Sequence, residues 1–74
     1  MKAIVWSKQL CPFCDQAKEL LKQKGYTIEE RKIGDEYTTE DLLEVVPGAR
    51  SVPQVFIDEK YIGGFSELRQ HLGK

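Results

Sequence analysis

Two cysteines, Cys11 and Cys14, are separated by two residues, and this spacing indicates redox chemistry. They follow a short apolar run at residues 3–6 and open a helical pattern that starts with Pro12. At such a junction, free backbone N–H groups and the positive end of the helix dipole favour the thiolate, which is the nucleophile. Three residues later, Cys14 returns to the same helix face within reach of a disulfide. One site can then attack a foreign disulfide and resolve the mixed product internally.

The two sulfurs are expected to have unequal roles. Cys11 is nearer the helix N-terminus and is the predicted attacking sulfur, whereas Cys14 lies one turn inside and should be more buried and less acidic. A CxxC pair can also be half of a zinc site. The chain has no second pair, however, and its single histidine, His71, is far along the sequence, so we expect no metal.

Length and composition predict one globular domain over residues 1–74. Apolar residues make up 41% of the chain and charged residues 31%, which is ordinary for such a domain. Eleven basic and twelve acidic side chains leave a net charge of -1, which gives no reason to expect nucleic acid as a partner. No apolar stretch approaches the ~20 residues of a membrane span, and the N-terminal apolar stretch is too short for a signal peptide. We therefore expect a cytoplasmic protein.

The predicted elements follow the order strand, helix, strand, helix, strand, strand, helix. An apolar run without alternation at residues 3–6 indicates a buried strand, and charged residues within 27–33 suit an edge strand. The other elements are a helix at 12–24, a helix capped by Thr38 or Thr39 and ended by Pro47, strands at 52–57 and 61–62, and a last helix capped by Ser66.

Three motifs in this order resemble the dithiol glutaredoxins of the thioredoxin-fold superfamily. They span residues 8–14, 51–57 and 63–68, and the match covers nearly the whole chain. The resemblance implies an α/β thioredoxin-like fold of the order β-α-β-α-β-β-α, with a four-stranded mixed sheet flanked by helices. It also implies a single glutaredoxin domain that acts as a glutathione-dependent thiol–disulfide oxidoreductase, with glutathione as co-substrate and no metal.

The same resemblance assigns residues to a glutathione site. Lys8 would contact glutathione, although a lysine at this position could equally be a solvated surface charge. Pro53 is expected to be cis and to face the cysteines, which leaves the backbone of Val52 free to pair with an extended substrate. The full predicted set is Lys8, Phe13, Val52, Pro53, Gly64, Phe65 and Ser66, with Arg50 and Ser51 as further candidates.

Two of these residues depart from what is commonest in the family. Phe13 stands where tyrosine is usual, and its place between the sulfurs predicts a partly exposed ring, although a helix phenylalanine is usually core. The helix start after Gly63-Gly64 would hold the γ-glutamyl end of glutathione. Many relatives carry aspartate where this chain has Ser66, which keeps a hydroxyl but loses a charge, with Glu67 next to it as a substitute.

The expected partners are glutathione and disulfide-bonded or glutathionylated proteins, with ribonucleotide reductase as one candidate, and the protein is expected to be a monomer. Two alternatives stay open. One is a thioredoxin-like electron donor reduced by a flavoprotein, and the other is a dimer that binds a [2Fe-2S] cluster through Cys11 and two glutathiones. Lys8 and the Gly63-Gly64 helix start favour glutathione as the donor, and by resemblance Pro12 is typical of reductases more than of cluster carriers.

Overall fold

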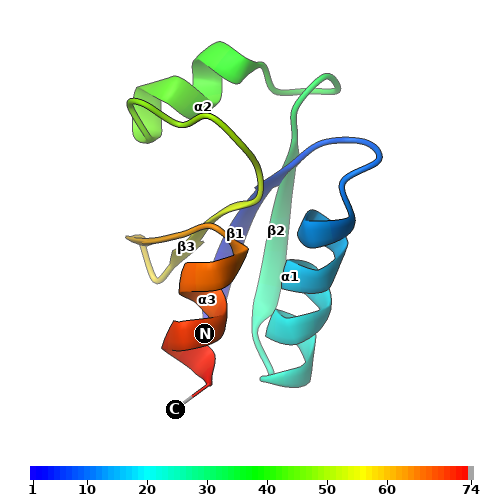
Figure 1. Cartoon of the computed structure of the whole chain (residues 1–74), viewed down its shortest axis with the longest axis vertical. Helices are drawn as coiled ribbons and strands as arrows, with labels where there is room; N and C mark the ends of the chain where they lie inside the picture. Colours follow the sequence, from blue (N-terminus) through cyan, green and yellow to red (C-terminus); the bar gives the residue numbers. More distant parts are fainter. Residues whose placement is uncertain (74) are drawn as a thin grey trace.

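The structure, a computed structural model, describes residues 1–73 and within them has four strands and three helices in the predicted order (Figure 1). The strands are β1 (Lys2–Ser7), β2 (Thr27–Lys32), β3 (Gln54–Ile57) and β4 (Lys60–Gly63). The helices are α1 (Pro12–Gln23), α2 (Thr39–Val45) and α3 (Phe65–Leu72). None of the helices in this range has both the length and the apolar character needed to cross a membrane.

The four strands form one mixed sheet in the order β2-β1-β3-β4, which confirms the predicted fold class. β1 pairs in parallel with β2 and antiparallel with β3, and β3 pairs antiparallel with β4. The charged strand β2 lies at an edge, as predicted. Its run of charged side chains at residues 29–32 disfavours pairing with a strand of another chain.

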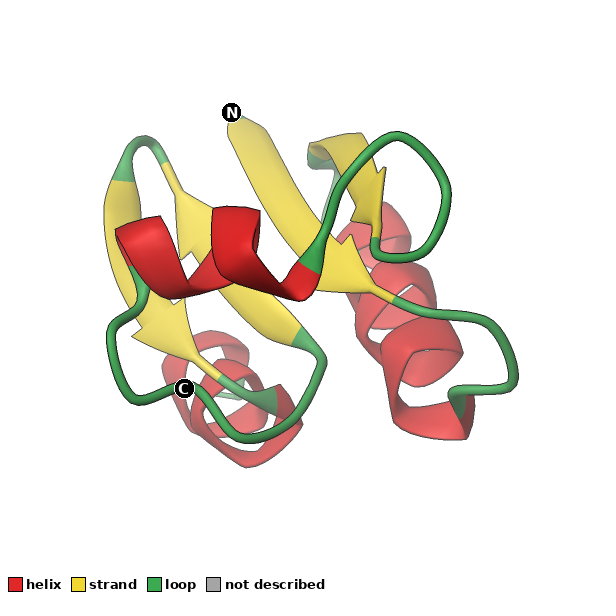
Figure 2. Cartoon of the chain, turned by 90° about the horizontal axis from the view of Figure 1, so that it is seen from above, coloured by secondary structure: helices red, strands yellow, loops and turns green. Residues whose placement is uncertain are grey.

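α1 and α3 lie on one face of the sheet (Figure 2), and Leu42 of α2 packs with side chains of the other face. Side chains that alternate along β1 explain this arrangement, because successive residues of a strand point to opposite faces. Ala3 and Val5 pack in the core beneath α1 and α3. Ile4 and Trp6 pack in the core beneath α2.

The main core joins β1 and β3 to α1 and α3. Ala17 and Leu21, one turn apart on α1, are fully buried in it, as is Leu68 of α3. The small side chain of Ala17 suits a close approach of α1 to the sheet, while Leu21 and Leu68 supply apolar area, worth roughly 1.5–3 kcal/mol for each buried leucine. The buried members are Ala3, Val5, Ala17, Leu21, Val55, Ile57 and Leu68.

The second core, on the α2 side of the sheet, is built around Trp6, which is 2% exposed. Leu42 and Val46 are buried with it, and Val52 is partly buried against the same cluster. The Tyr37 ring meets the Trp6 ring edge-on at 5.3 Å. This core therefore supports the segment that precedes β3.

Some element ends agree with the prediction, and others do not. Thr38 caps α2, because its hydroxyl accepts a hydrogen bond from the Asp41 N–H at 3.1 Å. The strand expected to start at Val52 starts instead at Gln54. The physical reason is Pro53, which has no N–H to donate to a sheet and so delays the pairing by two residues.

We predict that Leu68→Ala lowers the free energy of unfolding by about 2–5 kcal/mol, because it leaves a cavity in the main core. Leu43→Ala is the matched control, since Leu43 is 37% exposed on α2. It should cost less than about 1 kcal/mol. Urea denaturation of the two variants measures both values, and equal losses would contradict the assigned core.

Candidate redox site

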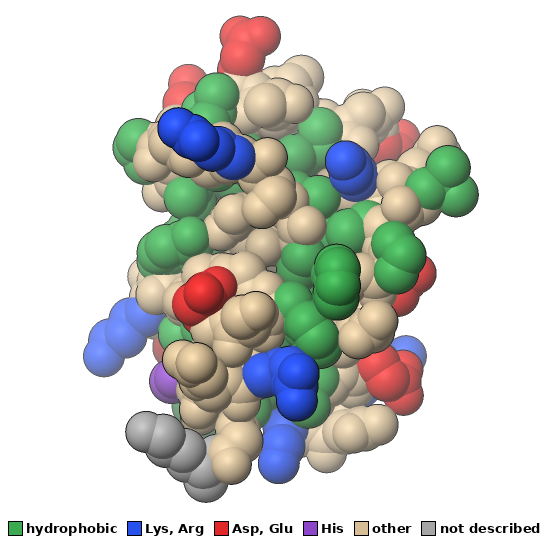
Figure 3. All heavy atoms as spheres, in the orientation of Figure 1, with side chains coloured by type: hydrophobic (Ala, Val, Ile, Leu, Met, Phe, Trp, Pro, Cys, Tyr) green, Lys and Arg blue, Asp and Glu red, His purple; other side chains and the backbone are tan. Residues whose placement is uncertain are grey.

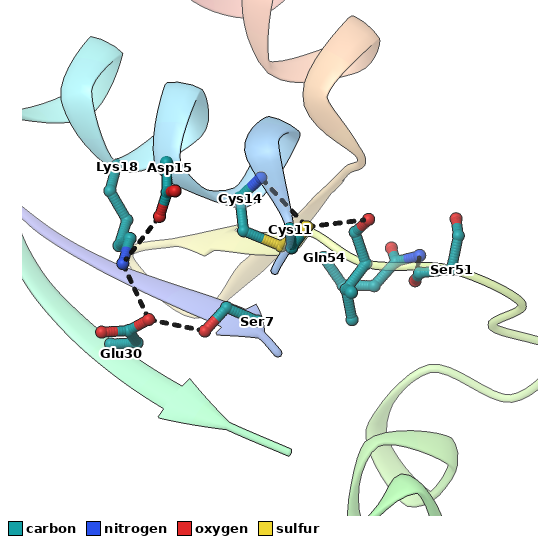
Figure 4. Close-up of a disulfide and its surroundings, with 9 residues drawn as sticks. Ser7, Cys11, Cys14, Asp15, Lys18, Glu30, Ser51 and Gln54 are labelled. Carbon is teal, nitrogen blue, oxygen red and sulfur yellow. Dashed lines mark hydrogen bonds and ion pairs between the residues drawn. A yellow bond between two sulfur atoms is a disulfide. The ribbon is translucent and has the colours of Figure 1, made fainter. Parts of the chain in front are cut away.

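Cys11 and Cys14 lie at the N-terminal end of α1, with Cys11 as the N-cap and Pro12 as the first helical residue (Figure 4). The two cysteines form a disulfide, and their α-carbons are 5.2 Å apart. The N–H of Cys14 points at the Sγ of Cys11, 3.2 Å away. A helix N-terminus favours negative charge, so this arrangement stabilises a thiolate on Cys11 once the disulfide is reduced.

The two sulfur-bearing residues differ in their access to solvent. Cys11 is 8% exposed and Cys14 is 1% exposed, which confirms that the second cysteine is the more buried. Cys11, as the less buried residue, is the one that a foreign disulfide can reach more easily, whereas Cys14 is placed to react with its neighbour in the pair. The geometry therefore suits Cys11 for attack and Cys14 for resolution.

The segment formed by Ser51, Val52 and Pro53 lies beside the cysteine pair. The Val52–Pro53 peptide bond is cis, as predicted. The carbonyl oxygen of Val52 is 3.8 Å from the Sγ of Cys11, which places this stretch of backbone against the reacting sulfur (Figure 4). A substrate that reaches Cys11 must therefore approach the Val52 backbone as well.

A hollow of about 290 Å³ adjoins this segment and the start of α3. Six of the seven predicted glutathione residues line it, and their role as ligands stays a prediction. The lining consists of Phe13, Ser51, Val52, Pro53, Gly64, Phe65, Ser66 and Glu67.

Aromatic side chains form one side of the hollow. Phe13 is 57% exposed, which confirms the predicted partly exposed ring, and its centroid lies 5.7 Å from that of Phe65. The Arg69 guanidinium lies over the Phe65 ring. On the face drawn in Figure 3, hydrophobic side chains gather where α1 and α3 lie next to each other, and basic side chains lie above and below them. This face offers apolar contact close to Cys11.

Lys8 is the one of the seven predicted glutathione residues that does not line this hollow. It is exposed and lines a separate hollow of about 460 Å³, which Lys32 and Asp35 also line. Arg50 is exposed in the loop before Ser51 and does not line the hollow beside Phe13. The structure therefore brings together the main-chain and aromatic parts of the predicted site but not its basic side chains.

The start of α3 differs from the prediction, because Gly64 and not Ser66 is the N-cap. The carboxylate of Glu67, the third helical residue, accepts a hydrogen bond from the Gly64 N–H at 2.8 Å and takes over the capping. Gly63 has φ +127°, and a β-carbon there would lie 2.8 Å from the Glu67 side chain. Ser66 and Phe65 contribute first-turn N–H groups that have no partner within the helix.

The sequence reasoning missed a polar cluster behind the cysteine pair (Figure 4). The hydroxyl of Ser7, which is 1% exposed, donates to Glu30 at 2.6 Å, and the Lys18 ammonium lies 2.8 Å from the same oxygen. The hydrogen bond from Lys18, together with that from Ser7, lowers the pKa of Glu30 below its ordinary value. A serine that ends an otherwise apolar strand was the available signal. The cluster ties α1, one turn beyond Cys14, to β1 and β2.

In the part of the chain that it describes, the structure offers no further ligands for a zinc ion beside the cysteine pair. Among residues 1–73, no three His, Cys, Asp or Glu side chains are grouped closely enough to hold one metal ion. His71 is exposed in the last turn of α3, whereas Gly64 at the other end of that helix adjoins the hollow. The cysteine pair alone supplies two of the four ligands that a structural zinc site uses.

Comparison with known proteins finds similarity over most of the chain. The family model described as Glutaredoxin matches residues 3–62. A hybrid peroxiredoxin of Haemophilus influenzae is 42% identical over 67 residues, which are 90% of this chain but 27% of that protein. Glutaredoxin 3 of Escherichia coli is 36% identical over 64 residues, covering 86% of this chain and 77% of the relative. The crystal structure of a buckwheat glutaredoxin–glutathione complex is similar with a TM-score of 0.79 at 32% identity, covering 97% of this chain and 70% of that one.

We predict that Glu30→Gln lowers stability by about 1 kcal/mol at neutral pH, because it weakens the charged contact with Lys18. The folded-state pKa of Glu30 lies below the ordinary 4.5, so the contact stabilises the fold above pH 4.5. This contribution is lost as the pH falls through the folded-state pKa. Urea denaturation at several pH values should therefore show wild type and variant converging in acid.

The control is Glu44→Gln, since Glu44 is an exposed carboxylate on α2. It should leave the stability unchanged within about 0.5 kcal/mol at every pH. A difference between Glu30→Gln and wild type that stays constant from neutral to acid pH would contradict the assigned role of the carboxylate.

Proposed function

Because this chain belongs to the glutaredoxin family, we propose that it is a glutathione-dependent thiol–disulfide oxidoreductase that reduces protein disulfides and glutathione mixed disulfides. The family membership implies thiol–disulfide exchange, and the Cys11–Cys14 pair supplies the two sulfurs. The observation that carries the glutathione part is the hollow next to Val52, which is lined by the rings of Phe13 and Phe65, by the segment 51–53 and by the start of α3.

The first step is attack by the Cys11 thiolate on one sulfur of the substrate disulfide. A new S–S bond forms to Cys11, the substrate S–S bond breaks, and its electron pair leaves with the other sulfur, which takes a proton from solvent. The Cys14 N–H and the start of α1 stabilise the attacking thiolate. The substrate is half reduced at this point and is joined to the protein through Cys11.

The second step releases the substrate by either of two routes. Cys14, as a thiolate, can attack the Cys11 sulfur and close the internal disulfide, which frees the substrate thiol. Alternatively, a glutathione thiolate attacks the mixed disulfide when the substrate bound to Cys11 is itself glutathione. That attack restores the Cys11 thiolate and releases oxidised glutathione. After the first route, two glutathiones reduce the internal disulfide in sequence and leave as oxidised glutathione. Potentials of about -200 to -230 mV, typical of glutaredoxins, suit this exchange.

Main-chain groups and aromatic rings are the proposed glutathione contacts. The Val52 backbone would pair with the peptide, and the first-turn N–H groups of α3 would meet its γ-glutamyl carboxylate. Phe13 and Phe65 would pack against its apolar atoms, and Glu67 would accept from its ammonium group. The buckwheat relative was solved as a glutathione complex, which supports glutathione as the ligand. Lys8, which lines a separate hollow, is a further proposed contact.

The proposal extends to partners and location. The protein is proposed to act as a monomer. A dithiol turned over by glutathione needs a reducing compartment, which supports the cytoplasm as the location. Ribonucleotide reductase is one proposed protein substrate, by resemblance to the family.

We predict that Cys11→Ser reduces glutathione-linked reductase activity to the uncatalysed background, because the attacking sulfur is lost. Cys14→Ser should keep most of the activity on a glutathione mixed disulfide, since a second glutathione can resolve it, and should lose activity on protein disulfides. Steady-state rates on both substrate types measure the split. Equal losses in the two variants would contradict the assigned roles.

We also predict that glutathione, and not a flavoprotein, is the direct electron donor. With glutathione, glutathione reductase and NADPH, the protein should turn over a glutathione mixed disulfide, as NADPH consumption reports. With thioredoxin reductase and NADPH but no glutathione, turnover on a protein disulfide should stay near the background. The reverse pattern would establish the thioredoxin-like alternative.

A further inference from the structure

Gln54 is a polar side chain buried directly after Pro53, at the first position of β3. It is 7% exposed and pairs with Trp6 in the β1–β3 register. Its Nε2 donates to the carbonyl oxygen of Ser51 at 2.8 Å, and its Oε1 accepts from the Tyr61 hydroxyl at 2.7 Å. Figure 4 shows its amide next to Ser51. A buried amide satisfied at both ends constrains every group that it contacts.

The chemistry of the partners fixes which way the amide points. The Ser51 carbonyl can only accept, so the Gln54 nitrogen must face it. The Gln54 oxygen then faces Tyr61, whose hydroxyl must be the donor. Tyr61 lies on the edge strand β4 and is 51% exposed. A surface hydroxyl therefore orients a buried amide, which in turn holds a backbone carbonyl.

The carbonyl that Gln54 holds belongs to the segment that meets the substrate. Ser51 directly precedes Val52, whose own carbonyl oxygen lies 3.8 Å from the Cys11 sulfur. Within residues 1–73, Gln54 supplies the one hydrogen bond from a nitrogen donor to the backbone of Ser51, Val52 and Pro53. Ser51 is exposed, and Val52 is partly buried against the second core.

We propose that Gln54 is a positioning residue for substrate binding, and that Tyr61 acts through it. The Tyr61–Gln54–Ser51 chain of hydrogen bonds fixes the backbone of Val52 at the distance from Cys11 that an incoming disulfide peptide needs for pairing. It touches neither sulfur, so it controls how tightly the substrate is held and not how readily Cys11 attacks. This inference rests on the proposed function, which supplies the substrate.

The test compares Tyr61→Phe, Gln54→Met and the double variant on a glutathione mixed disulfide. Gln54→Met, which keeps the length but removes the donor, should raise KM about 3- to 10-fold, and Tyr61→Phe about 2- to 5-fold. The kcat and the rate of Cys11 alkylation by iodoacetamide should stay within about 2-fold of wild type. The double variant should match Gln54→Met alone, because Tyr61 acts only through Gln54.

Tyr26→Phe is the matched control, since it removes the same hydroxyl from a partly buried tyrosine before β2 and should leave KM unchanged. An unchanged KM in Tyr61→Phe, with the fold intact by circular dichroism, overturns the proposal, even if Gln54→Met fails to fold. Additive effects in the double variant overturn the part assigned to Tyr61.

The proposed function fails in a different way. A wild type that is inactive on glutathione substrates would refute it and would leave Gln54 to be judged on a peptide disulfide with the same variants. On that substrate, a raised KM at constant kcat supports the positioning role, and an unchanged KM overturns it.

Discussion

The site depends on a single contact at the start of α1, where the Cys14 N–H points at the Cys11 sulfur. That contact exists only if the helix begins at Pro12 and is held at a fixed place against β1. Ala17 and Leu21, fully buried against the sheet, hold it there, and the Ser7–Glu30–Lys18 cluster adds a polar tie one turn beyond Cys14. The packing that holds α1 against the sheet therefore also fixes the position of the redox pair.

The cores on the two faces of the sheet each position one half of the site, namely the cysteines with the start of α3, and the segment at Val52. The main core fixes α1 and α3, and so places the sulfurs and the helix start that lines the hollow. The second core lies beneath α2 and supports Val52 from the opposite face. Because β1 contributes alternate residues to both cores, a shift of this strand would disturb both halves together. The small size of the fold therefore couples stability closely to site geometry.

The sequence was sufficient to predict the element order, the edge strand, the unequal burial of the cysteines and the cis bond before Pro53. These features follow from local patterns or from family motifs, each of which is a short continuous segment of the chain. The cap of α3 was mispredicted, because Ser66 and Glu67 both suit a helix start and only the packing of Glu67 against Gly63 selects between them. Gln54 and Glu30 could not be recognised as anchors, because their partners lie on other elements.

The start of α3 limits which groups can bind glutathione at the proposed site. The Gly64 N–H is already bonded to the Glu67 carboxylate, so a ligand carboxylate must use the N–H groups of Phe65 and Ser66 or displace Glu67. Within residues 1–73, no basic side chain lines this hollow. Lys8 lines a separate hollow. Backbone groups must then supply most of the polar contacts, and their value depends on how rigidly they are held. A buried amide that fixes one of these backbone segments thereby becomes part of the binding site without touching the ligand.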